Sequence, residues 1–278
     1  MARTLDFADH RRDLGDNRYV YAVVSRRAGG LSIGVNLNPD KVCNFDCPYC
    51  QVDRTVPGGP AKIDVERLED ELAHLLGLVG SGQLWDTPPF DTAAPAHRRV
   101  VDIAFAGDGE PTSPREFPAA ASTVRRVRDA LAPGVPVRLL TNATLLHRER
   151  VRSALVDIDE AWCKLDAGTE AWYRRVDGTR FPFARVLRNL RELAARRPIV
   201  VQSMFCAVGP DRPDATEIDA WVARLRDIVA TGRIAEVQVY TVARRPADDT
   251  VSPLSAAELD TIGAAARAAG LVVRVVGV

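Results

Sequence analysis

Three of the five cysteines in this 278-residue chain fall in one short stretch, "CNFDCPYC". Cys43, Cys47 and Cys50 are separated by gaps of three and then two residues. The N-terminus is charged and has no apolar run, so we expect neither a signal peptide nor a membrane anchor but a cytoplasmic protein with reduced thiols. Three reduced thiolates so close together predict a metal centre.

The spacing of these cysteines distinguishes between two kinds of metal centre. Structural zinc usually has four ligands in two separated pairs, whereas this chain has a single C-x2-C pair. A four-iron cluster is normally held by four cysteines, so three would leave one iron with an open coordination site. Such a cluster can bind and reduce a ligand. A zinc-binding or nucleic-acid adaptor module remains the non-enzymatic alternative.

The cysteine loop must be positioned by the strands and helices that alternate along the chain. A hairpin from Tyr19 leads through "RRAGG" into a first core strand near 31–38. At the other end, a last helix begins at the capping-box pattern 255–258 and is followed by the strand "LVVRVVGV". The remaining strands are predicted at 101–106, 137–141, 160–166, 199–206 and 236–242, and the helices at 63–78, 115–132, 146–155, 181–196 and 215–230.

Six core strands, each followed by a helix, predict a parallel α/β sheet that is closed or partly closed. We expect one domain over 1–278, with an N-terminal extension and hairpin in 1–30, a barrel in 31–250 and a C-terminal helix and strand in 251–278. The Pro-containing connection 80–97 interrupts the alternation, either as a lid or as a tolerated surface insertion.

The side-chain period of the strands predicts which residues face the interior of the sheet. Ala161, Cys163 and Leu165 share the face expected under the helices. The opposite faces of three strands are unusually polar, which favours an open lumen that holds ligands at the carboxyl ends of the strands. The predicted inward residues are Trp162, Lys164, Asp166, Gln202, Met204, Cys206, Gln238 and Tyr240.

The cysteine motif, with Tyr49 immediately before its last cysteine, resembles that of the radical S-adenosylmethionine (SAM) enzymes. The resemblance implies a [4Fe-4S] cluster on Cys43, Cys47 and Cys50, SAM on the fourth iron, and Tyr49 beside the adenine. It also implies reductive cleavage of SAM to a 5′-deoxyadenosyl radical that abstracts hydrogen from a substrate, which the sequence does not identify. The implied partners are that small or moderately sized substrate and a reductant such as flavodoxin or ferredoxin, with no membrane.

A second motif, "GDGEPT", resembles the glycine-glutamate motif that follows the second strand of that superfamily. Glycine permits close approach of the methionine amino group, and a carboxylate beside it can accept hydrogen bonds. The cofactor-binding candidates in this motif are Gly107, Asp108, Gly109 and Glu110.

Two more strand ends offer polar groups to the same cofactor. Asn142 in "LLTNATLL" and Asp166 in "KLDAG" suit ribose hydroxyls or polar groups of the methionine. The alternatives are that Asn142 caps the following turn and that Asp166 pairs with a neighbouring arginine.

From about Tyr19 to the last predicted helix the chain looks like the group related to the wyosine-base tRNA-modifying (4-demethylwyosine synthase-like) enzymes. The resemblance implies a partial (β/α)6 TIM-like barrel. No cysteine precedes Cys43, and we expect neither the extra cysteines nor the flavodoxin domain of those enzymes. Lys+Arg and Asp+Glu balance at 37 each, so no net charge favours nucleic acid, and tRNA base modification is the alternative function. Candidates for a basic face are Arg11, Arg12, Arg26, Arg27, Arg174, Arg175 and Arg180.

Lys164 and Cys206 are the catalytic candidates on the substrate side. Lys164 could form an imine, as the wyosine enzymes do with a lysine, or bind an anion; the alternative is a buried ion pair with Asp166. Cys206 could donate a hydrogen atom to a substrate radical, or simply fill the core. The substrate-binding candidates are Gln202, Tyr240, Arg244 and Arg245.

Overall fold

The computed structural model describes residues 15–25, 29–244, 246 and 248–276. Arg11, Arg12, Arg26, Arg27 and Arg245 therefore lie outside the described residues. The chain divides into two compact units that alternate along the sequence. The first unit comprises Met1–Val42, Pro57–Leu140 and Arg148–Glu160, and the second comprises Cys43–Val56, Thr141–His147 and Ala161–Val278.

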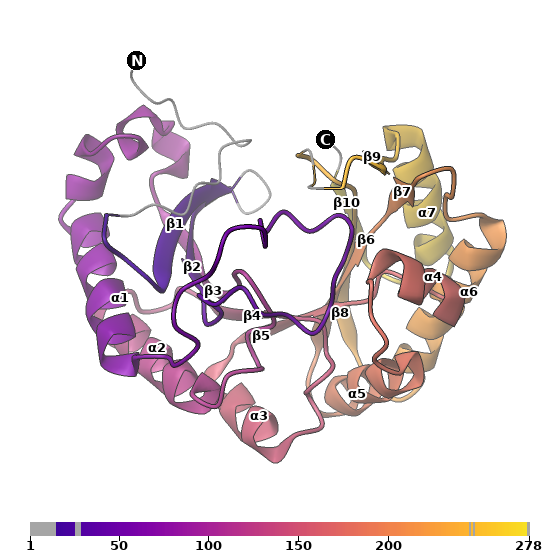
Figure 1. Ribbon diagram of the computed structural model, residues 1–278, viewed down its shortest axis with the longest axis horizontal. Helices are drawn as coiled ribbons and strands as arrows, with labels where there is room; N and C mark the ends of the chain where they lie inside the picture. The colour runs from indigo at the N-terminus through magenta and orange to yellow at the C-terminus, as the bar shows by residue number, and fades with distance from the viewer. Residues whose placement is uncertain (1–14, 26–28, 245, 247, 277–278) are drawn as a thin grey trace. The chain divides into compact units, whose positions relative to one another are not determined.

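The first unit contains the predicted hairpin and the first parallel strands, in the order β1-β2-β3-β4. β1 and β2 pair antiparallel, and β2, β3 and β4 pair parallel. Helices α1 and α2 pack against each other and run beside these strands in Figure 1. The elements are β1 (Val20–Ser25), β2 (Gly30–Val35), α1 (Val65–Gly80), β3 (Val100–Phe105), α2 (Phe117–Leu131), β4 (Val137–Thr141) and α3 (Glu149–Ala154).

A buried carboxylate fixes the start of β1. Glu71 on α1 accepts hydrogen bonds from the backbone N–H groups of Arg18, Tyr19 and Val20, at 2.8, 2.8 and 3.0 Å. Arg67, one helical turn earlier, donates to the same carboxylate through Nε at 2.8 Å. The carboxylate thus accepts from three consecutive backbone donors at the start of β1.

The connection 80–97 is packed onto the first unit. It forms three short 3-10 turns, Gln83–Asp86, Phe90–Thr92 and Pro95–His97. Leu84, Trp85 and Phe90 are buried, so apolar contacts hold the segment in place. Of the two alternatives, the structure favours a packed surface insertion over a lid.

Polar side chains on neighbouring strands of the first unit pair with one another. Asp102 of β3 accepts from the Ser32 hydroxyl of β2 and forms an ion pair with Arg138 of β4. Arg138 also binds Glu160 through Nε at 2.8 Å. The hydrogen-bonding groups of these side chains are therefore used between strands.

The second unit continues the parallel arrangement in the order β5-β6-β8-β10. Its helices pack in sequence, α5 with α6 and α6 with α7. The capping box is present, since the Ser255 and Glu258 side chains each bond the other's backbone N–H. The elements are β5 (Glu160–Lys164), α4 (Glu170–Val176), α5 (Phe183–Arg196), β6 (Ile199–Met204), β7 (Cys206–Val208), α6 (Ala215–Val229), β8 (Ile234–Tyr240), β9 (Val251–Pro253), α7 (Ala256–Ala268) and β10 (Val273–Val276).

The prediction of one strand over 199–206 is wrong at its end. β6 stops at Met204, whose N–H donates to the Asp166 carboxylate at 2.9 Å. Cys206 begins β7, which pairs antiparallel with β9 in a separate two-stranded sheet. Cys206 therefore does not continue the β6 face that carries Gln202 and Met204.

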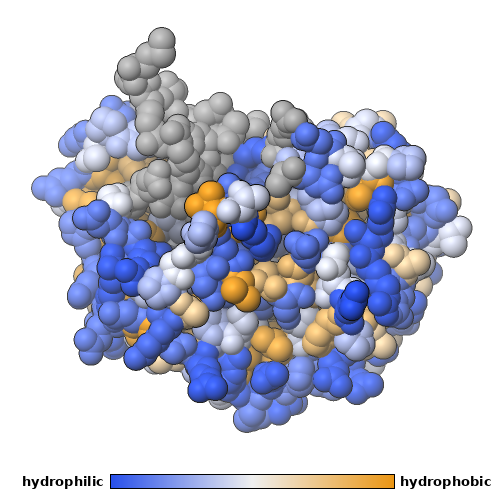
Figure 2. Space-filling view, in the orientation of Figure 1, coloured by the Kyte–Doolittle hydropathy of each residue, from blue (hydrophilic) through white to orange (hydrophobic). Residues whose placement is uncertain are grey.

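Hydrophilic residues predominate on the face drawn in Figure 2, where hydrophobic side chains form small separate patches. The large hydrophobic residues that are exposed are scattered along the described chain, as Val42, Val56, Leu131, Val156, Val229 and Val272. None of the described helices combines the length and apolar composition needed to cross a membrane.

The hydrogen bonds that Glu71 accepts at the start of β1 predict that removing its charge will destabilise the fold. Glu71→Gln places an amide N–H₂ group against backbone donors, and we expect the free energy of unfolding to fall by about 2 kcal/mol. Urea denaturation followed by circular dichroism measures this. Asp70→Asn, at an exposed neighbouring position, is the control and should leave stability nearly unchanged. Equal stability of the two variants would contradict the anchoring role.

Candidate functional site

The three motif cysteines are free thiols in one loop of the second unit, and each is partly exposed. The loop makes a tight turn in which the Cys50 N–H donates to the Cys47 carbonyl at 2.9 Å. The Phe45 N–H points at Cys43 Sγ at 3.5 Å, and Arg54 Nη1 lies 3.3 Å from Cys50 Sγ. Each of these two sulfur atoms thus has a nitrogen donor of the same loop beside it.

The cysteine loop offers three thiol groups as possible metal donors. Among the described side chains, no three His, Cys, Asp or Glu residues converge closely enough to hold one metal ion. An iron-sulfur cluster is bound by cysteine thiolates on separate irons, and thiolates are the donors that Cys43, Cys47 and Cys50 supply.

A turn far along the sequence holds the cysteine loop. The Cys47 thiol lies 3.6 Å from the Asp177 carbonyl and 3.8 Å from its carboxylate, while the Asp46 N–H donates to the same carbonyl at 3.2 Å. Gly178 has φ +57°, and a Cβ there would lie 1.9 Å from the Asp46 carbonyl oxygen. Sequence reasoning missed this turn; the Asp-Gly pair in "VDGTR" was the available signal.

Asp166 connects the cysteine loop to the strand ends. Its carboxylate accepts from the Tyr49 hydroxyl, pairs with Lys164 Nζ and receives the Met204 N–H. Lys164 Nζ is also 2.9 Å from Asp177 Oδ1 and 4.4 Å from the centroid of the Tyr49 ring. The structure thus shows the alternative raised for Lys164, a buried ion pair with Asp166.

Burial and neighbouring charges determine the protonation of Lys164, Asp166 and Asp177. Burial raises the pKa of Asp166, and it raises the pKa of Asp177 to about 7. Burial acts to lower the pKa of Lys164, but the attraction of the two carboxylates prevails and holds it well above its usual value. Lys164 is therefore an ammonium at neutral pH, whereas imine formation requires a neutral amine.

Two of the cysteine thiols in this unit have raised pKa values. Burial raises the pKa of Cys47, with Lys164 opposing, and burial raises the pKa of Cys206 to about 12. Cys206 is completely buried and is therefore an S–H group at neutral pH. It retains the hydrogen atom that its predicted role requires, and that role stays a prediction.

Asn142 uses its side-chain amide within the protein. Its Oδ1 accepts from the Thr144 N–H at 3.1 Å, which is the turn-capping alternative, and its Nδ2 donates to Asn44 Oδ1 at 2.7 Å. The amide thus connects the loop after β4 to the cysteine loop. Contact of Asn142 with SAM stays a prediction.

The predicted substrate-binding residues lie on the strands and loops that follow. Gln202 is buried and donates to Gln238 at 3.1 Å, so it supports the sheet interior. Tyr240 is half-buried at the end of β8. The Arg244 carbonyl accepts from Gln51 Nε2 at 3.4 Å, which connects the loop after β8 to the cysteine loop.

The glycine motif belongs to the first unit. A Cβ on Gly107 would lie 2.3 Å from Asn36 Oδ1, and one on Gly109 would lie 2.2 Å from the Val42 carbonyl oxygen. Both glycines thus make room for the chain that runs from β2 to the residue before Cys43. This close approach of protein backbone and side chain is a reason for glycine that sequence reasoning did not consider.

The acidic residues of the motif also have partners within the first unit. Asp108 accepts from Asn36 Nδ2 at 2.7 Å. Glu110 is buried, and its carboxylate accepts from the Thr112 N–H at 3.2 Å and from the Thr112 hydroxyl at 2.6 Å. Their predicted contact with the methionine amino group is not tested by these bonds.

No protein-family model matches the chain. A UPF0026 protein of Helicobacter pylori strain 26695 is 26% identical over 247 residues, which cover 86% of this chain and 71% of that protein. A UPF0026 protein of Methanocaldococcus jannaschii is 28% identical over 155 residues, covering 56% of this chain and 42% of that protein. The chain thus spans less than half the length of the M. jannaschii relative.

Solved structures share the fold at low sequence identity. A radical SAM methyltransferase from Sphaerobacter thermophilus aligns with a TM-score of 0.64 and 12% identity, over 93% of this chain and 69% of that chain. Streptococcus suis SuiB bound to SAM aligns with a TM-score of 0.59 and 11% identity, over 91% of this chain but only 52% of its own length. TYW1 with a lysine-pyruvate adduct bound aligns with a TM-score of 0.50 and 14% identity, over 76% and 72%.

These alignments confirm the predicted resemblance and the predicted fold class. The described elements include the expected N-terminal hairpin, β1 and β2, and the short C-terminal strand β10. The chain therefore has the fold of the radical SAM enzymes, a partial (β/α)6 TIM-like barrel.

Proposed function

We propose that this protein is a radical SAM enzyme whose Cys43, Cys47 and Cys50 bind a [4Fe-4S] cluster. When bound there, the cluster and SAM supply one-electron cleavage of SAM to methionine and a 5′-deoxyadenosyl radical, which abstracts hydrogen from an organic substrate. The observation that carries the proposal is the loop itself, in which three free thiols are held by contacts to Asp166 and Asp177.

The residues around the cysteines have distinct tasks in this proposal. Tyr49 would lie beside the adenine, and Asp166 orients its hydroxyl. The ribose is assigned to Asn142 or Asp166, and the contact of the methionine end with the motif Gly107–Glu110 stays a prediction from the sequence. A flavodoxin or ferredoxin is the proposed reductant, and the cytoplasm would keep the thiols reduced.

Metal loading tests the cluster assignment. Anaerobic reconstitution with iron and sulfide should give about four irons per chain, an absorbance band of iron-sulfur charge transfer and dithionite-dependent cleavage of SAM. Cys47→Ala should lose all three properties. Cys163→Ala, at a buried cysteine of β5 outside the motif, is the control and should keep them. Zinc without iron, or a cluster that survives Cys47→Ala with unchanged SAM cleavage, would refute the assignment.

We assign to Lys164 the role of an ion-paired ammonium between Asp166 and Asp177. The lysine-pyruvate adduct belongs to TYW1. Here the two carboxylates favour the charged amine, which is not a nucleophile. An imine on Lys164 remains the alternative, and it would require loss of this proton.

Two substitutions separate these roles. Lys164→Met leaves two buried carboxylates without a counter-ion, and we expect the free energy of unfolding to fall by about 3 kcal/mol. Lys164→Arg keeps the charge and should keep most of the stability and the full iron content. Chemical denaturation and iron analysis measure both. A stable Lys164→Met variant, or a borohydride-trapped carbonyl adduct on wild-type Lys164, would contradict the ion-pair role.

One surface favours the alternative of a tRNA base modifier. Helix α5 buries its apolar side chains on one face and exposes arginines on the other. None of these arginines forms an ion pair with a described side chain, so their charge is available to phosphates. They are Arg185, Arg188, Arg191 and Arg196.

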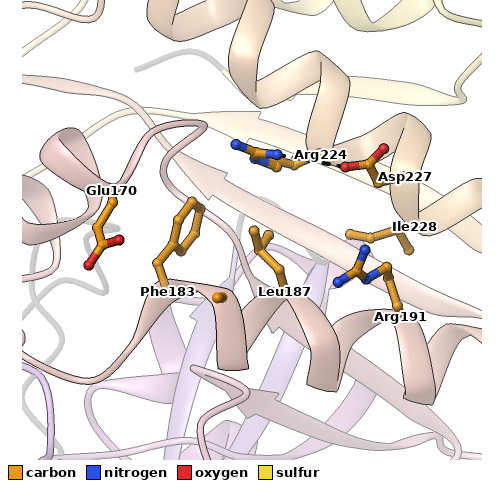
Figure 3. Close-up of a pocket in the computed structure, with 8 residues that line it drawn as sticks. Glu170, Phe183, Leu187, Arg191, Arg224, Asp227 and Ile228 are labelled. Carbon is orange, nitrogen blue, oxygen red and sulfur yellow. Dashed lines mark ion pairs between the residues drawn. The ribbon is translucent and has the colours of Figure 1, made fainter.

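A pocket of about 330 Å³ lies beside this face, between α5 and α6. In Figure 3, Phe183, Leu187 and Arg191 of α5 face the side chains of α6. Across the pocket, Arg224 and Asp227 pair at 3.7 Å. Apolar surface beside guanidinium groups can receive a nucleic-acid base while the neighbouring arginines bind phosphates. This pocket adds to the support for the alternative.

Charge removal on α5 tests the alternative. The wild type should bind bulk tRNA at low salt, and the triple variant Arg185→Gln, Arg188→Gln, Arg191→Gln should reduce the slope of log affinity against log salt by about 3. The control replaces three arginines of the first unit that already form ion pairs, Arg125, Arg126 and Arg152, and has the same net charge. Absence of binding at low salt, or equal losses in both variants, would remove this alternative.

A further inference from the structure

Three side chains of the second unit close a ring of hydrogen bonds beside the first cysteine. Asn44 Nδ2 donates to the Thr144 hydroxyl, Thr144 donates to Asn142 Oδ1, and Asn142 Nδ2 donates back to Asn44 Oδ1. Each of the three distances is 2.7 Å. Every member donates once and accepts once within the ring, so breaking one bond removes a partner from two side chains.

The part of the ring that follows β4 rests on a fixed backbone. Ala143 has φ +63°, an unfavourable conformation for a residue with a Cβ. Buried Asn189 of α5 stabilises it by donating to the Ala143 carbonyl at 2.7 Å and to the Thr144 carbonyl at 3.1 Å. A helix of the second unit thus holds Thr144 and Asn142 in place.

The other part of the ring is the residue between Cys43 and Phe45. The Thr179 hydroxyl donates to the Asn44 carbonyl at 3.1 Å, so both the backbone and the side chain of Asn44 are held. Phe45 is buried and packs edge-on against Tyr173, with ring centroids 5.8 Å apart. Because Cys43 directly precedes these two residues, its position depends on theirs.

We propose that Asn44, Asn142 and Thr144 are positioning residues that order the Cys43 end of the loop independently of any bound group. The inference rests on the proposed cluster and adds the means by which its first ligand is held. Ordering a flexible loop on metal binding would cost conformational entropy, and contacts made by the protein itself reduce that cost. The ring should therefore raise cluster affinity and slow the loss of iron.

Thr144 offers a matched pair of variants. Thr144→Val has nearly the same shape but loses the hydroxyl that donates to Asn142 and accepts from Asn44. Thr144→Ser keeps the hydroxyl and loses only a methyl group. Hydrogen exchange of the metal-free protein, followed by mass spectrometry, reports on the amides of residues 43–46 directly. Removal of iron by a chelator from the reconstituted protein reports on the cluster.

We expect Thr144→Val to accelerate both exchange at 43–46 and iron loss by about tenfold, and Thr144→Ser to behave like the wild type. Unchanged exchange in Thr144→Val would overturn the proposal, as would equal acceleration in Thr144→Ser. A lower global stability without faster exchange at 43–46 would show a merely structural hydroxyl and would also overturn it. Asn44→Ala, at an exposed position, should reproduce the Thr144→Val result if the latter folds poorly.

The two measurements separate this inference from the proposed function. Exchange in the metal-free protein needs no cluster, so it tests the ring even if the chain binds no iron. If the wild type binds no iron but Thr144→Val exchanges faster, the cluster assignment fails and the ordering role of the ring remains.

Discussion

The candidate site depends on one buried group of charges. Lys164 has two carboxylate neighbours, Asp166 and Asp177, and each carboxylate also contacts the cysteine loop. Asp166 receives the Tyr49 hydroxyl, and Asp177 lies against Cys47. Away from water, neither carboxylate would be tolerated without the ammonium, and the ammonium would be costly without them. The ion pairs therefore hold β5, the turn after α4 and the cysteine loop in a single arrangement.

Close backbone approach is the second constraint, and glycine meets it in both units. Gly178 lets the turn after α4 lie against the Asp46 carbonyl, and Gly109 lets the glycine motif lie against the Val42 carbonyl. Asp46 and Val42 stand on either side of the first cysteine. Gly109 thus limits the path of the chain before Cys43 within the first unit, and Gly178 limits its path after Cys43 within the second.

Local patterns predicted the elements well, because the spacing of apolar residues within a segment reveals whether it forms a strand or a helix. The strand 137–141 and the capping box at Ser255 were predicted as the structure has them. The break at Phe205 was missed, since Met204 gives its N–H to Asp166, which lies just beyond the end of β5. The spacing of apolar residues within 199–206 contains no information about a hydrogen-bond partner elsewhere in the chain.

The site was predictable to the extent that its chemistry is local. The spacing of Cys43, Cys47 and Cys50 indicates iron-sulfur ligands because all three lie within one loop. The residues that hold this loop, among them Asp177 and Thr144, are distant in sequence and common in turns, so their types carry little information. The Lys164–Asp166 pair was within reach, since alternation along one strand places both on one face.

The contact between Cys47 and Asp177 spans 130 residues of chain. During synthesis, the cysteine loop is made early, but the turn that holds it follows only after α4. Contacts of such long sequence separation form late, once the intervening elements have folded. A nascent chain would therefore expose three thiols before it could order them. The thiols would be most open to oxidation, or to binding the wrong metal, while the chain is still on the ribosome.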